Sequence, residues 1–376
     1  MGEFPYKPGV PTLPHQRTIP SNASRFVGPS LTRSATLERM DPPSRTPPQR
    51  LGPYVLGERL GLGGMAEVFV ATRPGARGFN KRFAVKRILP ELARDARFVA
   101  MFCDEARICA SLSHPNIVEV IDFGESDGEV FMALEYVDGL SLAKLLRMVA
   151  GAKRRFPVPV ALFIAHEVLR ALDFAHGASD EQGRPLGIVH RDVSPGNVLI
   201  GRTGEVKLGD FGILLSSFVD RRTHPGELKG KVGYMSPEQA MGGSIDVRSD
   251  LFALGIVLSE MLLARPLFSG KNEFEILTKI HEADVSNLDK YGHGIPPEVL
   301  DIARTALARE PAKRYASAAA FALAIQSETE RLGMGAGPAE LVSWLSAVGA
   351  LPSRSGTMPV QRVEDYLPSA RTKDER

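Results

Sequence analysis

The sequence IVHRDVSPGNVLI, at Ile188–Ile200, places a polar loop between two apolar runs. Thirteen residues after Asn197 the chain reads DFG, beginning at Asp210. Together the two segments offer two carboxylates and one amide on neighbouring loops. Asp210 and Asn197 carry the hard oxygen ligands that suit Mg2+ held on phosphates. Asp192 is then the group that positions a hydroxyl nucleophile and takes its proton.

A glycine cluster with the sequence LGLGGMAEV joins two predicted strands nearer the start of the chain. Glycines let the backbone approach a phosphate closely and turn without a Cβ clash. The flanking strands argue against a Rossmann site, where a helix should follow, and an ordinary hairpin turn is the alternative. The residues of this candidate phosphate-binding segment are Leu60, Gly61, Leu62, Gly63, Gly64, Met65, Ala66, Glu67 and Val68.

Lys86 stands at the end of an apolar strand, in the sequence Ala84-Val85-Lys86. Its aliphatic stem can pack inward while its ammonium reaches a phosphate or an acid. In the helix predicted over about 98–112, helical spacing places Glu105 within an apolar stripe. A carboxylate on an apolar face needs a partner, and Lys86 is the one we expect. The alternative is that Glu105 tilts to solvent beside Arg107.

The order and spacing of these motifs resemble those of the eukaryotic-type serine/threonine protein kinase family, in its bacterial branch. The resemblance covers about residues 54–332. It implies an α+β, bilobal protein kinase fold, with a β-rich N-lobe over 54–137 and an α-helical C-lobe over 138–332. It further implies ATP and Mg2+ as cofactors, and transfer of the γ-phosphoryl group to Ser or Thr hydroxyls of protein substrates and of the chain itself, in bacterial signalling.

The resemblance also implies roles for single residues. Lys86, fixed by Glu105, would hold the α- and β-phosphates, Asn197 and Asp210 would hold Mg2+, and Asp192 would orient the acceptor. Leu134 falls at the gatekeeper position. The rest of the nucleotide site would then include Ala84, Glu135, Val137 and Leu199.

Other motifs carry implied structural roles. Ser236-Pro237-Glu238 stands where the family has Ala-Pro-Glu, and Arg314 matches the buried salt-bridge partner of that glutamate. Asp250 resembles the helix F aspartate that braces the catalytic loop. His114 is expected to be structural rather than chemical.

The chain departs from the family pattern at two linked positions. Ser194 replaces the catalytic-loop lysine that stabilises charge on the transferring phosphoryl group. Lys231 replaces a threonine that contacts the catalytic aspartate in the family. We hypothesise an exchange, in which Lys231 pairs with Asp192 and faces the γ-phosphate while Ser194 takes over the hydroxyl's hydrogen bond. The alternative is independent drift, with Lys231 in solvent. A further departure, Ala66 for the third glycine, is expected to matter little because alanine is small.

Glu227 lies seven residues before Tyr234, where many relatives carry an activating phosphothreonine. A fixed carboxylate can partly replace a phosphate there, so activity without activation-loop phosphorylation is expected. The alternative leaves Ser216, Ser217 or Thr223 as the switch.

Composition excludes several other classes of protein. The 376 residues include 46 Lys and Arg against 44 Asp and Glu, a formal net charge of +2, which argues against nucleic-acid binding by bulk charge. Cys103 and Cys109 cannot form a disulfide framework or a Cys-rich zinc site. No apolar run reaches the roughly 18 residues of a membrane span. The first residues lack the pattern of an export signal, so a cytoplasmic protein is expected.

The flanking regions differ from residues 54–332 in composition. Residues 1–53 read as a Pro-rich, basic and disordered tail, whose PPSRTPP run at 42–48 is a candidate docking segment for a partner. Residues 333–376 read as a C-terminal tail with one short amphipathic helix around Trp344. Within the C-lobe, Leu251–Leu263 is expected to be a buried core helix rather than a membrane span.

Two alternative functions are left open by the sequence. The first is an ATP-binding pseudokinase scaffold with weak or no catalysis, which Ser194 favours and the intact Lys86, Asp192, Asn197 and Asp210 disfavour. The second is a small-molecule phosphotransferase of related fold. The Ser-Pro-Glu motif at 236–238 and the long segment before it favour a protein substrate instead.

Overall fold

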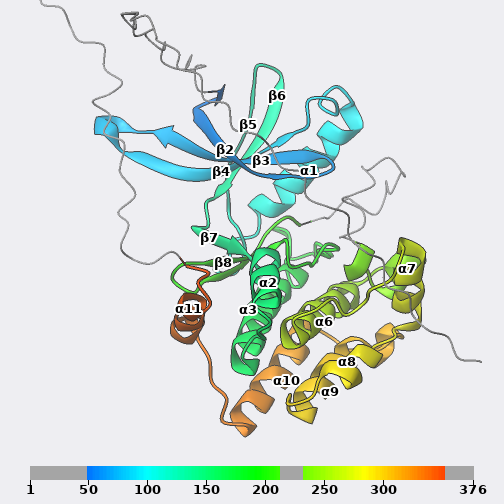
Figure 1. The fold of residues 1–376 in the computed structure, drawn as a ribbon. Coiled ribbons are helices and arrows are strands. Elements are labelled where there is room, and N and C mark those ends of the chain that lie inside the picture. The colour runs from blue at the N-terminus through cyan, green and yellow to red at the C-terminus, as the bar shows by residue number, and fades with distance from the viewer. Residues whose placement is uncertain (1–48, 212–231, 352–376) are drawn as a thin grey trace, which may run out of the picture. The chain divides into compact units, whose positions relative to one another are not determined.

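The computed structural model describes residues 49–211 and 232–351. Several expectations fall outside these ranges, namely those for the proline-rich run at 42–48 and for Ser216, Ser217, Thr223, Glu227 and Lys231. The two lobes predicted from the sequence are present, and the α+β architecture is confirmed (Figure 1).

The N-lobe is built on an antiparallel sheet with the strand order β1-β2-β3-β4-β6-β5. Its strands are β1 (Arg50–Leu51), β2 (Tyr54–Leu62), β3 (Ala66–Pro74), β4 (Asn80–Ile88), β5 (Val120–Ser126) and β6 (Glu129–Glu135). A 3₁₀ turn, η1 (Ala76–Gly78), follows β3. Asp127 and Gly128, both with positive φ, join β5 to β6, because a two-residue turn of this hand matches the twist of the strands.

Helix α1 (Ala96–Ala110) is inserted between β4 and β5. It begins where the Asp95 side chain accepts a hydrogen bond from the Arg97 amide, a typical N-cap. Phe102 and Ala106 pack against Ile88 and Met132 of the sheet. On the other face of the sheet a second cluster surrounds Tyr54, which is fully buried. Alternate residues of β4 therefore serve two different cores.

The C-lobe is helical, with a small sheet of order β7-β8-β9 facing the N-lobe. This sheet consists of β7 (Gly139–Ser141), β8 (Val198–Gly201) and β9 (Val206–Leu208). The helices are α2 (Leu142–Gly151), α3 (Val158–His176), α5 (Pro237–Ala240), α6 (Val247–Leu263), α7 (Glu273–Glu282), α8 (Ser286–Tyr291), α9 (Pro297–Ala306), α10 (Ala318–Arg331) and α11 (Pro338–Ala347). The 3₁₀ turns η2 (Val232–Tyr234) and η3 (Pro311–Lys313) complete the lobe.

Helix α6 is buried along almost its whole length, as the sequence predicted for Leu251–Leu263. A helix that is apolar on all sides belongs in the interior of a large lobe. Gly255 permits its close contact with α9, since a Cβ at this position would lie 2.9 Å from the Ala306 Cβ. Among residues 49–211 and 232–351, no helix has the length and apolarity needed to cross a bilayer.

Helix α11 forms where the short amphipathic segment was expected, but the sequence did not predict its packing. Leu341 and Leu345 are fully buried in the C-lobe core, and the Trp344 ring lies 4.5 Å from the Phe156 ring. The carbonyl of Pro338 lies against Gly204 in the β8–β9 turn, where φ is +90°. The helix is therefore integrated with the lobe and supports the turn between two strands beside the catalytic loop.

Candidate active site

Lys86 lies at the centre of a charged cluster drawn from three elements. Its Nζ is 2.7 Å from Glu105 Oε1 of α1 and 2.9 Å from Asp210 Oδ1, after β9. Burial acts to lower the pKa of Lys86, but Asp210 and Glu105 outweigh burial and raise it above its usual value. The ammonium is therefore charged at physiological pH. The predicted pairing of Lys86 with Glu105 is confirmed, and Glu105 does not tilt to solvent.

The glycine cluster forms the turn between β2 and β3. The Gly63 amide donates to the Ala66 carbonyl at 2.8 Å and closes the turn. Val68 pairs with Lys86 across β3 and β4, so the turn and the lysine lie at the same end of the sheet. Glu67 is one residue out of phase with Val68, and its carboxylate contacts Arg87 at 2.8 Å rather than Lys86. The Glu67 side chain is therefore turned away from Lys86, and only its backbone faces the expected nucleotide site.

The catalytic loop is held by its own side chains. Asn197 Nδ2 donates to the Asp192 carbonyl at 2.8 Å and to Asp192 Oδ2 at 3.0 Å. Because the amide nitrogen makes both contacts, the amide oxygen is the atom that suits a metal ion. The Gly209 amide donates to the Asn197 carbonyl at 2.9 Å, which ties the loop to the segment before Asp210.

His190 is fully buried and links Asp192 to the same segment. The Asp192 amide donates to His190 Nδ1 at 3.2 Å, and His190 Nε2 lies 3.2 Å from the Gly209 carbonyl. Burial lowers the pKa of His190. A neutral ring protonated on Nε2 satisfies both contacts at once, so the imidazole has a structural part here.

Asp250 braces the loop from below, as the resemblance implied. It is 1 % exposed on α6 and accepts hydrogen bonds from the backbone amides of His190 and Arg191, both at 2.8 Å. Arg191 has a φ of +66°, a conformation that a non-glycine residue adopts only when its surroundings hold it. The carboxylate of Asp250 supplies that restraint.

Two contacts that support the catalytic loop, one directly and one through Asp250, were not predicted from the sequence. His176 Nε2 lies 2.9 Å from Asp250 Oδ2, and Gln239 Nε2 donates to the Arg191 carbonyl at 3.0 Å. Gln239 forms a capping box with Ser236 at the start of α5. That spacing is visible in the sequence, but it indicates a helix start and not a contact with a distant loop.

The conformation of Asp210 and Phe211 turns the Asp210 carboxylate toward Lys86 and the Phe211 ring into the core. Asp210 has a φ of +53°, and the buried Phe211 ring lies 4.4 Å from the His190 ring. Ser194 is buried, and its carbonyl accepts the Asn197 amide at 3.0 Å. Its proposed counterpart, Lys231, lies outside the described residues, so the exchange of the two positions stays a hypothesis.

The residues expected around adenine lie between the two lobes. Ala84 and Leu134 oppose each other in β4 and β6. Ala84, Leu134, Val137 and Leu199 are only partly buried, as residues that cover a planar ligand would be. The Glu135 amide donates to the Glu119 carbonyl at 2.9 Å, so its carbonyl is the backbone group that suits the adenine edge.

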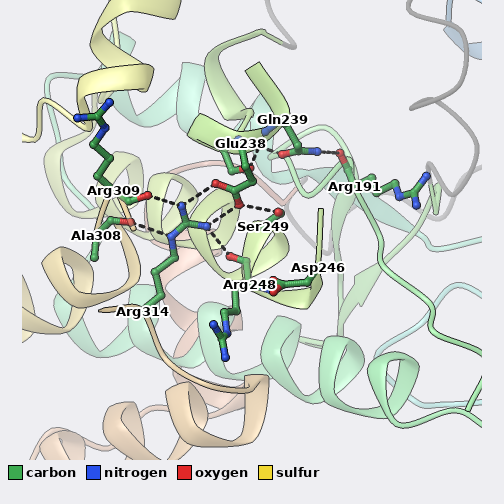
Figure 2. A network of polar contacts seen from close by, with 10 residues as sticks. Arg191, Glu238, Gln239, Asp246, Arg248, Ser249, Ala308, Arg309 and Arg314 are labelled. Carbon is green, nitrogen blue, oxygen red and sulfur yellow. Dashed lines mark hydrogen bonds and ion pairs between the residues drawn. The ribbon is translucent and has the colours of Figure 1, made fainter. Parts of the chain in front are cut away.

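Glu238 and Arg314 form the buried ion pair that the resemblance implied (Figure 2). Two parallel bonds join them, at 2.7 and 2.8 Å, and the Arg314 side chain is 0 % exposed. Burial acts to raise the pKa of Glu238, but bonds from Arg314 and Ser249 outweigh it and hold the pKa at about 2. Arg314 also donates to the carbonyls of Arg248, Ala308 and Arg309.

Glu260 of α6 is a second buried acid, and its partner Tyr234 is the last residue of η2, just before α5. Tyr234 donates its hydroxyl to Glu260 Oε2 at 2.7 Å, and the Leu267 amide donates to Oε1 at 3.2 Å. Burial raises the pKa of Glu260 to about 7 despite these bonds. Since the folded-state pKa is raised, the stabilising effect of protonation is complete below the ordinary value of 4.5 and is lost as pH rises through 7.

Glu260→Gln should therefore flatten the pH dependence of stability between pH 5 and 8. The wild type should lose up to roughly 3 kcal/mol of unfolding free energy over that range from this group alone. Urea unfolding of both proteins at pH 5 and at pH 8 measures the difference, in which contributions from other titrating groups cancel. If the unfolding free energies of the two proteins changed equally with pH, the raised pKa of Glu260 would be contradicted.

The fold and this site define a class. A partly buried lysine held by two acids beneath a glycine-rich turn, with an Asp–Asn pair on a braced loop, is the arrangement of an ATP-dependent protein kinase. The family model for the protein kinase domain matches residues 54–324, and the chain belongs to that family.

Its relatives are bacterial kinases. The chain is 39% identical over 317 residues to the tyrosine-protein kinase MasK of Myxococcus xanthus, covering 81% of this chain and 49% of MasK. It is 34% identical over 267 residues to the serine/threonine-protein kinase PrkC of Bacillus subtilis, covering 71% of this chain and 39% of PrkC. The chain thus spans about half, or less, of the length of these relatives. Among solved structures it is similar to the PknI kinase domain of Mycobacterium tuberculosis, with 28% identity, a TM-score of 0.54, and coverage of 75% of this chain and 97% of that chain.

Proposed function

We propose that this chain transfers the γ-phosphoryl group of ATP to Ser and Thr hydroxyls of proteins, including its own, in bacterial signalling. The observation that carries the proposal is the assembled cluster of Lys86, Glu105 and Asp210 beside the Asp192–Asn197 pair. These contacts support the proposal, because phosphoryl transfer depends on charged and polar groups held in fixed positions. A pseudokinase that had lost its activity would have no need of the complete set.

Each residue has a proposed part in the transfer. Lys86, held by Glu105, binds the α- and β-phosphates. Asn197 and Asp210 supply hard oxygen ligands that fit Mg2+, which when bound neutralises charge on the phosphates. Asp192, positioned by Asn197, orients the acceptor hydroxyl and takes its proton. Little covalent chemistry is asked of the protein, so positioning and charge carry most of the rate.

The choice of Ser and Thr over Tyr rests on PrkC and similar relatives, which are named serine/threonine-protein kinases, whereas MasK is named a tyrosine-protein kinase. The deciding experiment supplies γ-labelled ATP and Mg2+ to the full chain, alone and with a generic basic protein. Acid hydrolysis of the product should release phosphoserine and phosphothreonine. Phosphotyrosine as the sole product would overturn the substrate assignment. ATP binding without any transfer would favour the pseudokinase scaffold, which Ser194 alone supports.

The displaced-lysine hypothesis gives a sharper prediction. Lys231→Ala should lower kcat by roughly 10²-fold, the loss expected when one group that stabilises transition-state charge is removed. Lys229→Ala is the matched control, because it removes the same charge two residues away in the chain. Steady-state phosphorylation of a basic protein compares the two variants. Similar losses in both would indicate that Lys231 has no special part.

We also propose that the proline-rich run at 42–48 docks a partner that binds polyproline segments. Its support is the sequence alone, in which four prolines flank Ser44, Arg45 and Thr46.

A further inference from the structure

A buried ion pair lies directly beside the nucleotide lysine. Glu67, at the start of β3, pairs with Arg87 of β4 in the register position next to the pair of Val68 and Lys86. The Arg87 Nε donates to Glu67 Oε1 at 2.8 Å. Glu67 is 6 % exposed and Arg87 is 8 % exposed. Both charges are therefore withdrawn from water, one residue away from Lys86 and at the base of the glycine turn.

Two further charges extend this pair across the sheet. Arg59 of β2 lies 3.5 Å from Glu67 Oε2, and Arg87 Nη1 donates to Glu129 Oε2 of β6 at 2.9 Å. The Arg87 guanidinium also lies over the Phe69 ring, 5.1 Å from its centroid. Basic and acidic side chains thus alternate over β2, β3, β4 and β6. We call Arg59, Glu67, Arg87 and Glu129 the ion-pair row.

The row crosses the β2–β3 pairing where that pairing is irregular. The register between β2 and β3 shifts on both sides of Arg59, first between Leu56 and Arg59 and then between Arg59 and Gly61. An irregular ladder fixes the relative position of two strands poorly. Through its two carboxylate oxygens, Glu67 contacts β2 on one side and β4 on the other. One side chain therefore links both arms of the glycine turn to the strand that carries Lys86.

Stability alone does not explain a pair of this kind. Removing two charges from water is expensive, and well-packed apolar residues often replace such pairs without loss. What an ion pair adds is a defined geometry between the groups that it joins. Here the groups joined are the phosphate-covering turn and the phosphate-binding strand.

We propose that Glu67 is a positioning residue that holds the glycine turn at a fixed height over Lys86, through Arg59 and Arg87. The proposal rests on the proposed function to the extent that nucleotide phosphates bind beneath the turn. Without the carboxylate, the turn must be ordered anew each time that nucleotide binds. Nucleotide affinity then falls, while the chemical step, which Asp192 and Asn197 carry, changes less.

The test is Glu67→Gln in the full chain, which keeps the size of the side chain and removes its charge. Calorimetric titration with a non-hydrolysable ATP analogue and Mg2+ should show binding weakened roughly tenfold, within the range by which coupled positions alter binding. The KM for ATP should rise by a similar factor, with kcat within about twofold of the wild type. Arg59→Gln should shift both the affinity and the KM in the same direction, but by less. The Arg59 side chain is 54 % exposed, so this substitution should leave folding intact.

Tyr54→Phe is the matched control. It removes a hydrogen bond of 3.0 Å to Asp122 from a fully buried side chain of the same sheet, far from the turn in register. This substitution should lower the thermal midpoint of unfolding without weakening the binding of the ATP analogue. The proposal is overturned if folded Glu67→Gln and Arg59→Gln bind the analogue as the wild type does, or if Tyr54→Phe weakens binding equally. Because binding is measured apart from transfer, a wild type that binds the analogue but transfers no phosphate would refute the proposed function only.

Discussion

Asp192→Asn should lower the rate of phosphoryl transfer by roughly 10³-fold, within the 10²–10⁴ range of a positioned acid or base. The substitution preserves shape, so the Asn197 contact to the Asp192 carbonyl, at 2.8 Å, can persist. The amide cannot take the proton of the acceptor hydroxyl. Nucleotide binding should stay intact, because Lys86, Glu105 and Asp210 do not depend on this carboxylate for their contacts.

The measurement is single-turnover transfer from labelled ATP, paired with analogue binding and a thermal midpoint. Asp127→Asn provides the control, because it makes the same chemical change in the exposed turn between β5 and β6 and should alter none of the three. Transfer by Asp192→Asn at more than a tenth of the wild-type rate would remove Asp192 from its proposed part. A loss of analogue binding in parallel would point to a folding defect instead.

Arg314→Met should reduce the free energy of unfolding by about 3–5 kcal/mol, because it leaves the Glu238 carboxylate buried without its guanidinium. Wild-type stability from this group should be present above pH 4.5 and lost as pH falls toward 2, since the pKa of Glu238 is held low. Arg314→Met should remove that dependence. Urea or guanidinium unfolding at pH 7 and pH 3 measures both effects.

The neighbouring Lys313 offers a matched comparison. It pairs with Glu310 at 2.7 Å, but both side chains are more than half exposed. Lys313→Met should therefore change stability by no more than about 1 kcal/mol, the range of surface pairs. The double variant Arg314→Met with Glu238→Gln should recover part of the loss, because no buried charge is then left unpaired. Equal losses for Arg314→Met and Lys313→Met would contradict the prediction.

Much of the candidate site could be predicted from the sequence because local spacing determines it. Glu105 falls within the apolar stripe of a helix, and a carboxylate in that position requires a nearby cation. Lys86 is the cation that the preceding strand supplies, and the two are joined at 2.7 Å. The parts played by Asp250 and by the Glu238–Arg314 pair followed from the family resemblance, and the contacts are present.

The contacts that were missed depend on register or on distant packing. Glu67 and Arg87 are 20 residues apart, and in sequence each looks like an ordinary charged residue on a strand. Only the β3–β4 register brings them together and away from water. His176 and Asp250 are 74 residues apart on two helices. The hydrophobic periodicity of a helix shows which of its faces is buried, but not which other helix that face contacts.

Helix α11 extends the apolar core of the C-lobe beyond the end of the family match. The family match stops at residue 324, inside α10, yet the same apolar core continues to the fully buried Leu341 and Leu345. A polypeptide cut at the family boundary would lose the last turns of α10, uncover Phe156 and remove Pro338 from the β8–β9 turn. Since cavities and uncovered apolar surface destabilise a lobe as a whole, the destabilisation would reach β8 and β9, which precede Asp210. For this chain we therefore expect a stable kinase domain to require α11, beyond the end of the family match.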